Sequence, residues 1–261
     1  MFDRALHAVT APIARRLKPA LEGLCQIETA IARRWVSSAH KRLMAIQWQV
    51  PPSPEHFDHH IDLFYQWPAL RNAQWVERGV FGALALRGGP LLEICCGDGF
   101  NARNFYSLRS ASVIACDFDP MAIRTAIRKN SAPNVTYVLA DIRTDMPSGM
   151  FETVVWDAAI EHFTPEEIDQ ILASVKSRLT PDGILSGHTL VERPGSGKYC
   201  CHHEYEFKSM ADLARFLTPL FKTVTVFETM YPDRHNLYFW ASDRPVPFRS
   251  EWPNVLTITR D

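Results

Sequence analysis

The sequence predicts an α/β fold: a doubly wound, mostly parallel sheet of seven strands, a C-terminal antiparallel hairpin and a helical N-terminal extension. Apolar runs alternate with helix-like segments through most of the chain, which is typical of a parallel sheet with helices on both faces. Two β-rich stretches divided by a "PDR" turn close the series and should pair. Three prolines at positions 51, 52 and 54 end a basic helical segment, so we expect two parts, residues 1–50 and 51–261.

The N-terminal part is basic, with eight Lys or Arg against three Asp or Glu, in a chain of net charge −1. Apolar residues recur at helical spacing from Leu21 to Trp35, and Pro12 and Pro19 should break the helix. Such a segment could form a helical cap, a homodimer contact or a peripheral contact with an anionic membrane, and the sequence leaves these alternatives open.

Several classes of protein are disfavoured by composition. The sequence contains no run of 18 apolar residues, so we expect no membrane span. The N-terminus lacks the apolar core of a secretion signal. The near-zero net charge does not indicate nucleic-acid binding. The cysteines include two adjacent pairs, which suit a disulfide framework poorly. We therefore expect a cytoplasmic protein, with peripheral membrane contact left open, and reduced cysteines at positions 25, 95, 96, 116, 200 and 201.

The elements of the larger part follow in order. A helix over 70–86 leads to a "RGGP" break. Further helices are expected to begin at Pro120, at Thr164 with Pro165 in the first turn, and at Ser209, because these residues suit helix starts. The strands are expected over 90–96, 112–118, 134–141, 151–157, 182–190, 222–231 and 235–242, and the remaining helices over 100–108, 120–130, 164–179 and 209–221.

The segment "LLEICCGDGF" ends the first strand with Gly97 and Gly99. In parallel sheets ligands lie beyond the carboxyl ends of the strands, and glycine lets ligand atoms approach the backbone. Asp117 ends the second strand 24 residues after Glu93, where a carboxylate can accept both hydroxyls of a ribose. Asp141 ends the third strand, where it could meet an adenine amino group. Together these residues predict a nucleoside pocket.

Two nucleoside cofactors compete for this pocket. "GDGFNA" fits the dinucleotide pattern G-x-G-x-x-A, so an NAD(P)-dependent dehydrogenase is one alternative. A pyrophosphate, however, needs amide donors without nearby negative charge, and Asp98 and Glu93 both belong to this segment. S-adenosylmethionine carries an ammonium group of its own and suits these acids better. We find neither a Tyr-x-x-x-Lys pair nor a second catalytic domain after the hairpin, and both observations argue against the dehydrogenase.

The region from about Pro90 to Asp243 resembles the class I S-adenosylmethionine-dependent methyltransferases. "LLEICCGDG" is similar to the first motif of this family, "ACDFDPMAIRTA" to its second-strand acid and following helix, and "LADI" to its third-strand motif. "FETVVWDAAIEHF" followed by "RLTPDGILSG" resembles its fourth strand, "EH" element and Pro-x-Gly turn. The nearest likeness is the small-molecule branch, which includes quinone O-methyltransferases and sugar N-methyltransferases. The resemblance implies methyl transfer to O or N of a small molecule or saccharide.

The resemblance also implies roles for the pocket residues. Glu93 would orient the loop and approach the ammonium group, Asp117 would take the ribose, and Asp157 would close the pocket. The implied cofactor set is Glu93, Cys95, Gly97, Gly99, Asp117 with the adjacent Phe118, Asp141 with Ile142, and Asp157.

Cys95 departs from the family pattern, because it stands where the family has its first glycine. A positive φ there would cost a cysteine roughly 1–2 kcal/mol, whereas an extended backbone would cost nothing. The sequence leaves both conformations open, and the side chain could also crowd the methionine tail of the cofactor.

The "EH" element should border the transferred methyl group. His162 is the candidate base or substrate contact, because histidine titrates near neutral pH, and Glu161 is a second candidate. A histidine that only caps local structure is the alternative. The loop "KYCCHHEYEF" should overhang the acceptor, with Tyr65 and Trp67 covering the cofactor unless they are core aromatics. The candidate acceptor contacts are Tyr65, Trp67, His162, Tyr199, His202, His203 and Glu204.

Neither a metal site nor a nucleic-acid substrate is expected. Neither "HFDHHID" nor the loop at 198–207 has the paired spacing of a structural zinc site. The absence of an Asn-Pro-Pro-Tyr motif after "FETVVW", together with the acidic core, disfavours nucleic acid. A non-catalytic S-adenosylmethionine-binding partner subunit is a third class, against which the "EH" element argues.

Overall fold

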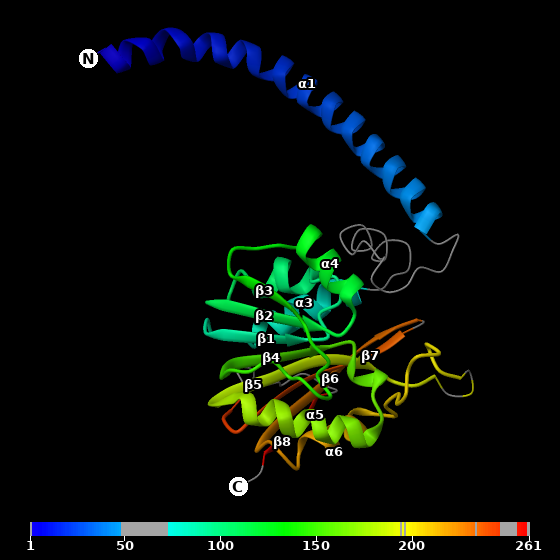
Figure 1. Ribbon diagram of the computed structural model, residues 1–261. Coiled ribbons are helices and arrows are strands. Elements are labelled where there is room, and N and C mark those ends of the chain that lie inside the picture. The colour runs from blue at the N-terminus through cyan, green and yellow to red at the C-terminus, as the bar shows by residue number, and fades with distance from the viewer. Residues whose placement is uncertain are drawn as a thin grey trace. The chain divides into compact units, whose positions relative to one another are not determined.

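The computed structural model describes residues 2–47, 73–193, 195, 197–232, 234–245 and 255–259. The chain divides into two compact units, Met1–Pro52 and Ser53–Asp261. Helices cover both faces of one sheet in the second unit, and α1 belongs to the first (Figure 1).

The first unit contains one continuous helix, α1 (Phe2–Gln47). The expected breaks at Pro12 and Pro19 are wrong, because the helix runs through both residues. Each proline removes one backbone hydrogen bond and crowds the preceding turn, which a long helix can accommodate by bending, and Figure 1 shows α1 as a curved helix. No helix among the described residues is long and apolar enough to cross a membrane.

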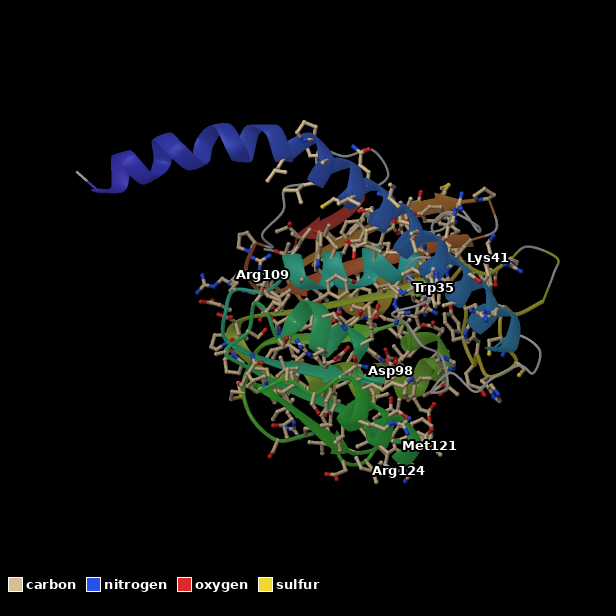
Figure 2. The ribbon with its side chains drawn as sticks, turned by 90° about the horizontal axis from the view of Figure 1, so that it is seen from above. Trp35, Lys41, Asp98, Arg109, Met121 and Arg124 are labelled. Carbon is tan, nitrogen blue, oxygen red and sulfur yellow. The ribbon has the colours of Figure 1, made fainter. Side chains whose placement is uncertain are left out.

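The apolar side chains of α1 that the structure describes, from Leu17 to Val36, are exposed to solvent. Trp35, labelled in Figure 2, is 75% exposed. Lys18 forms an ion pair with Glu22 one turn away, which is the usual solvent-facing arrangement on a helix. The other exposed apolar residues of α1 are Leu17, Leu21, Leu24, Ile27, Ile31 and Val36.

The second unit contains an eight-stranded sheet in the order β3-β2-β1-β4-β5-β7-β6-β8. Neighbours from β3 to β5 are parallel, and β7 is antiparallel to both β5 and β6. The α/β class, the parallel order and the C-terminal hairpin are confirmed. The strands are β1 (Pro90–Ile94), β2 (Ser112–Asp117), β3 (Val135–Leu139), β4 (Phe151–Asp157), β5 (Leu179–Leu190), β6 (Thr223–Tyr231), β7 (Arg234–Ser242) and β8 (Val255–Thr259).

The expected number of seven strands is wrong, because β8 pairs antiparallel with β6. Its sequence "VLTIT" is rich in β-branched residues and suits a strand, but it is short and follows a proline-rich stretch without a clear turn signal. Without β8, the edge of β6 would expose unpaired backbone groups next to a buried apolar surface.

The remaining helices are α3 (Gln74–Leu84), α4 (Pro120–Lys129), α5 (Pro165–Arg178) and α6 (Met210–Leu217). The expected caps are confirmed: Thr164 and Glu167 form a capping box at α5, and Ser209 accepts a hydrogen bond from Asp212 N at α6. The segment after the glycine loop differs from an ordinary α-helix, because Ala102–Tyr106 forms a short π-helix, a feature frequent at functional sites.

The two faces of the sheet pack against different helices. Leu92 belongs to the core formed with α5 and α6, whereas its neighbour Leu91 packs with residues of α3 and α4. This alternation follows from the two-residue period of a strand. Because both faces are buried, the polar residues at the carboxyl ends of the strands are left at one edge of the sheet, where the candidate site lies.

Candidate functional site

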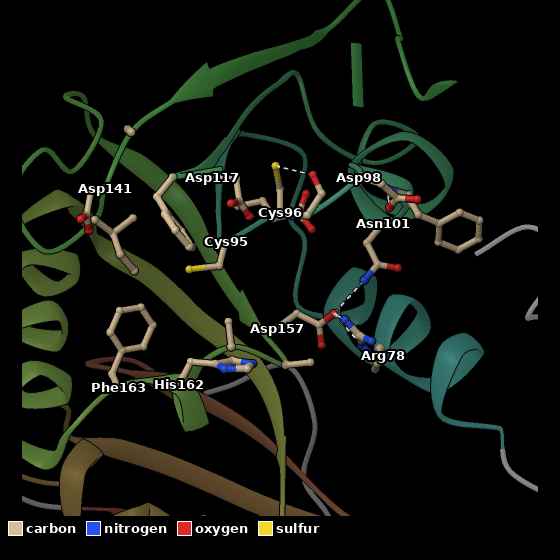
Figure 3. A pocket seen from close by; sticks show the side chains of 18 of the residues that line it. Arg78, Cys95, Cys96, Asp98, Asn101, Asp117, Asp141, Asp157, His162 and Phe163 are labelled. Carbon is tan, nitrogen blue, oxygen red and sulfur yellow. Dashed lines mark hydrogen bonds and ion pairs between the residues drawn. The ribbon is translucent and has the colours of Figure 1, made fainter. Parts of the chain in front are cut away.

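A cavity of about 530 Å³ lies at the carboxyl ends of β1, β2 and β4, within the size range of small-molecule sites. Figure 3 shows Asp117 and Asp141 on one side of the pocket and Asp157, His162 and Phe163 on the other, with Cys95 between them. Residues expected at the site that line the cavity are Glu93, Cys95, Gly97, Asp117, Phe118, Asp141, Ile142, Asp157, His162 and His202.

The glycine loop has a left-handed backbone at three positions. The φ angles are +58° at Cys95, +54° at Gly97 and +73° at Gly99, so the extended alternative for Cys95 is excluded. A Cβ added to Gly97 would meet no atom within 4 Å, and its backbone therefore borders open space. Gly99 does not line the cavity, and a Cβ there would collide with the ring of Tyr137. Gly97 therefore leaves room for a ligand beside the loop, whereas Gly99 allows the ring of Tyr137 to pack closely against the loop.

Asp117 is held by backbone amides on both carboxylate oxygens. Gly97 N donates to Oδ2 at 2.9 Å, and Asp119 N donates to Oδ1 at 3.0 Å. These two bonds fix the orientation of the carboxylate at the end of β2, where Asp117 lines the cavity.

Glu93 is the unusual acid of the pocket. Its side chain is 3% exposed, and Oε2 has no hydrogen-bond partner among the described residues. Burial, followed by the nearby charge of Asp157, raises the pKa of this carboxyl well above its ordinary value. A buried acceptor without a donor is costly, and a ligand carrying an ammonium group would supply both donors and the opposite charge. The residues present therefore fit S-adenosylmethionine.

Asp157 is engaged by two residues that the sequence reasoning did not single out. The Nη2 of Arg78 lies 2.6 Å from Oδ2 of Asp157, and Nε donates to the same oxygen at 2.8 Å. Asn101 Nδ2 also donates to it at 2.8 Å (Figure 3). Arg78 comes from α3, so Asp157 ties this helix to the end of β4. In the sequence, the presence of an arginine on the otherwise apolar face of residues 74–84 could have indicated that Arg78 has a buried acidic partner.

The adenine end of the cavity is more open. Asp141 accepts hydrogen bonds from Nε and Nη2 of Arg143 at 2.7–3.1 Å, and these bonds hold the pKa of its carboxyl below the ordinary value. Ile142 is buried beside it, whereas Phe118 is 67% exposed at the rim. Asp141, which was expected to accept a hydrogen bond from an adenine amino group, therefore already accepts hydrogen bonds from Arg143.

The acceptor end is formed by the turn Ile160–His162 and the loop before α6. His162 is exposed, and its Nδ1 lies 3.1 Å from the backbone oxygen of His202. Because a carbonyl can only accept, Nδ1 carries the proton and Nε2 keeps its lone pair in the neutral ring. Both His162 and His202 line the cavity.

Three other expected acceptor contacts, Tyr199, His203 and Glu204, do not line this cavity. His203 is buried against Glu206, and Tyr199 lies under the guanidinium of Arg193, 3.8 Å from its ring centre. Glu204 is exposed, and its backbone nitrogen donates to the oxygen of Glu161. These residues shape the loop rather than the cavity wall.

Glu161, the second catalytic candidate, is 2% exposed and does not line the cavity. Its Oε2 accepts a hydrogen bond from the hydroxyl of Thr189 at 2.9 Å. Tyr65 and Trp67 lie outside the described residues, so their expected role over the cofactor stays a prediction.

Comparison with known proteins agrees with this geometry. Residues 91–183 match the model of a methyltransferase domain, and no curated protein sequence matches the chain. The fold is that of the class I methyltransferases. The chain carries a methyltransferase domain over residues 91–183, and the family resemblance expected from the motifs is confirmed over these residues.

Several solved structures share the fold at low sequence identity. The complex of DhpI with S-adenosylhomocysteine is 20% identical, with a TM-score of 0.53, and covers 73% of this chain and 94% of that chain. The N-methyltransferase NodS of Bradyrhizobium japonicum is 15% identical, with a TM-score of 0.51 over 68% and 90% of the two chains. A TehB-like methyltransferase of Corynebacterium glutamicum is 16% identical, with a TM-score of 0.50 over 74% and 100%.

Proposed function

We propose that this protein is an S-adenosylmethionine-dependent methyltransferase that acts on O or N of a small molecule or a saccharide. The supporting observation is the cavity, whose size suits a cofactor with a small acceptor. Its walls carry Glu93, Asp98, Asp117 and Asp141, and this concentration of acids disfavours a polyanion such as nucleic acid.

The proposed cofactor contacts follow from the unpartnered Oε2 of Glu93, the open space at the backbone of Gly97 and the acids that line the cavity. Glu93 would accept from the ammonium group, Gly97 would let the methionine tail approach its backbone, and Asp117 would accept from the ribose hydroxyls. Asp141 and Ile142 would border the adenine. The cofactor supplies an electrophilic methyl group on a sulfonium, and the task of the chain is to align an acceptor with it.

His162 is the proposed catalytic residue at the acceptor end. Its Nε2 lone pair is available in the tautomer imposed by the His202 carbonyl, and it can take a proton from a hydroxyl or an ammonium acceptor. Asp157 would not act as a base in this arrangement, because Arg78 and Asn101 hold it. Glu161 would have a positioning role, because it contacts both Thr189 of β5 and the loop that contains Glu204.

Calorimetry with S-adenosylhomocysteine and with NADH tests the cofactor half of the proposal. We expect micromolar binding of S-adenosylhomocysteine and no binding of NADH, and the reverse result would overturn it. A methyl-transfer screen over hydroxylated and amino small molecules tests the acceptor half. With an acceptor in hand, His162→Ala should lower turnover about 10²- to 10⁴-fold at unchanged cofactor affinity. A fully active, destabilised variant would assign His162 to local structure.

We also propose that residues 1–50 form a part separate from the catalytic part, residues 51–261. The exposed apolar side chains of α1, among them Trp35, support a contact with a second surface. A second copy of this chain and an anionic membrane both suit a basic amphipathic helix.

A further inference from the structure

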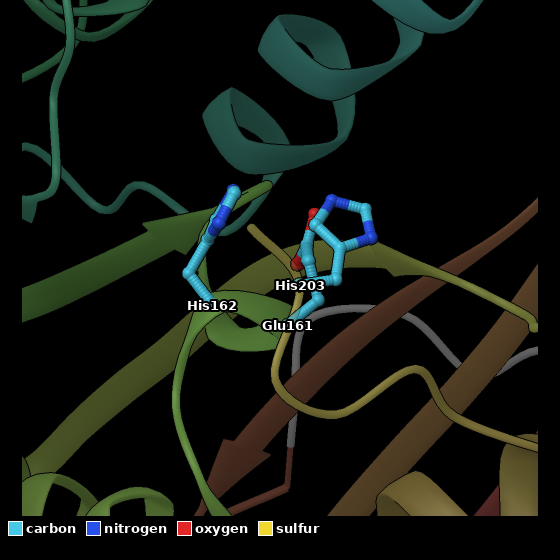
Figure 4. Close-up of side chains that lie close together, drawn as sticks. All are labelled: Glu161, His162 and His203. Carbon is cyan, nitrogen blue, oxygen red and sulfur yellow. The ribbon is translucent and has the colours of Figure 1, made fainter. Parts of the chain in front are cut away.

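Three potential metal ligands come together beside the acceptor end of the cavity. Glu161 and His162 belong to the turn after β4, and His203 belongs to the loop between β5 and α6 (Figure 4). One ligand atom from each of the three residues lies within 4.8 Å of the others. Glu161 and His203 are buried and His162 is exposed, so the cluster has one open side.

The two histidines are oriented as metal ligands usually are. His203 Nδ1 is hydrogen-bonded to the buried carboxylate of Glu206, and His162 Nδ1 to the carbonyl of His202. In each ring Nδ1 therefore carries the proton and Nε2 keeps its lone pair. A carboxylate or carbonyl on the second ring nitrogen is the common support of a metal-bound histidine.

Glu161 offers the third donor. Thr189 donates a hydrogen bond to its Oε2, and the described residues give no hydrogen bond to its other carboxylate oxygen. The backbone oxygen of Glu161 accepts from the nitrogens of Glu204 and Tyr205 at 2.8 and 3.0 Å. The residue that precedes His162 thus also anchors the loop that carries His203, so the three ligands share one local framework.

We propose that Glu161, His162 and His203 bind a divalent transition metal of the Zn²⁺ type at the acceptor end of the pocket. Two imidazoles and one carboxylate are a known three-ligand set for catalytic zinc, with a further position left open. With metal–nitrogen distances of 2.0–2.1 Å, tetrahedral ligand atoms lie about 3.3 Å apart, so the cluster must contract. The exposed ring of His162 can move, whereas the other two side chains are held.

The surrounding charges select the kind of metal. Burial lowers the pKa of Arg234, and the nearby charge of Glu161 partly opposes this effect. Lys198 Nζ donates to the backbone oxygen of His203. These two cations offset the carboxylates of Glu161 and Glu206. Mg²⁺ and Ca²⁺, which depend on several oxygen ligands, are therefore disfavoured relative to metals that bind imidazole strongly.

The metal site deepens the proposed function and rests on it for its consequence. A hydroxyl oxygen of the acceptor would fill the open position, and a bound metal lowers the pKa of such a hydroxyl, whose proton leaves to water. The acceptor atom would then be oxygen rather than nitrogen. In the metal-loaded protein His162 would be a ligand, and no separate base would be needed.

Metal titration of the full chain tests the site without any assay of activity. The protein, without a histidine tag, is stripped with a chelator and titrated with Zn²⁺ by calorimetry and with Co²⁺ by visible absorption. We expect one ion per chain. His162→Ala and His203→Ala should each weaken binding more than 100-fold, and Glu206→Gln should weaken it about 10- to 100-fold. His235→Ala is the matched control, because His235 pairs with Glu228 on the β6–β7 hairpin, and it should bind as the wild type does.

Two results would overturn the metal site: no stoichiometric binding, or equal binding by the His162 and His203 variants at an unchanged melting temperature. His162→Ala keeps this test open if the buried variants fail to fold, since His162 is exposed. S-adenosylhomocysteine binding by the stripped protein separates the two proposals. If the protein binds S-adenosylhomocysteine but fails to bind a metal ion, the metal site alone is refuted, whereas folded protein that binds no S-adenosylhomocysteine refutes the proposed function.

Discussion

Cys95 occupies a backbone conformation that suits glycine, and replacing it tests how the loop is strained. Its φ of +58° lies in the left-handed region, where a side chain costs roughly 1–2 kcal/mol. Glycine removes this strain but gives the unfolded chain more freedom, which costs about 0.4–1 kcal/mol. Cys95→Ala keeps the strain and removes only the sulfur. Cys95→Gly should therefore be more stable than Cys95→Ala by about 0.5–1 kcal/mol.

Thermal unfolding of the two variants without cofactor measures this difference. In a folded unit of this size 1 kcal/mol shifts the melting temperature by about 2–4 °C, so Cys95→Gly should melt about 1–4 °C above Cys95→Ala. Ala158→Gly is a matched control, because Ala158 also lines the cavity and has a φ of +49°. It should show a similar gain without the loss of a sulfur.

The same variants report on the cofactor. The thiol of Cys95 lines the cavity, and if it crowds the methionine tail, both variants should bind S-adenosylhomocysteine more tightly by a similar factor. Equal melting temperatures for Cys95→Gly and Cys95→Ala would refute the strain argument, and it would then follow that the loop adopts another conformation in solution.

Three further changes test the pocket and its surroundings. Asp117→Ala should lower S-adenosylhomocysteine affinity about 10- to 150-fold, because hydrogen bonds to a charged group are worth about 1.5–3 kcal/mol. Its control, Asp119→Ala, removes the N-cap of α4 and should cost about 1 kcal/mol of stability at unchanged affinity; equal affinities in both variants would contradict the ribose role. The pKa of Glu93 is raised in the folded state. The stability of the folded state with respect to Glu93 is therefore greatest at pH values below the unfolded pKa and falls as the pH rises through the folded pKa. Glu93→Gln should therefore melt higher than the wild type at pH 7, lose this advantage below about pH 4, and bind the cofactor more weakly; a lower melting temperature at pH 7 would refute the burial penalty. Deletion of residues 1–50 should leave S-adenosylhomocysteine affinity unchanged and abolish either self-association in the ultracentrifuge or salt-sensitive binding to anionic vesicles, and a loss of nucleoside affinity would place part of the pocket in the deleted segment.

Much of the fold was predictable because strand and helix periods are local properties of the sequence. Each predicted strand of the parallel sheet was found, since buried strands are short apolar runs with clear ends. Asp117 and Asp141 were predictable from the same reasoning, because the carboxyl ends of parallel strands meet at one edge. The caps at Thr164 and Ser209 required only the residues themselves.

Other features depended on contacts that no local pattern contains. The partner of Asp157 is Arg78, 79 positions earlier in the chain, and no motif connects the two. The β8 strand is defined by its pairing with β6 rather than by its own short sequence. Glu161 and His203 come together only because the loop after β5 folds back onto the turn after β4, and so the spacing of histidines alone did not indicate a metal site.

The acids of the pocket differ in how completely the chain satisfies them, and this difference indicates what the site is built to receive. Asp117 accepts two backbone amides, Asp141 is held by an arginine, and Asp157 by an arginine and an amide. Glu93 takes no hydrogen bond from the described residues, although it is buried beside Asp157. A buried carboxylate in this position lowers the stability of the folded chain at neutral pH unless a cation joins it. In the proposed function the ammonium group of the cofactor would be that cation, and part of the stability lost at Glu93 would be recovered on binding. Cofactor binding should therefore stabilise the wild type more than Glu93→Gln.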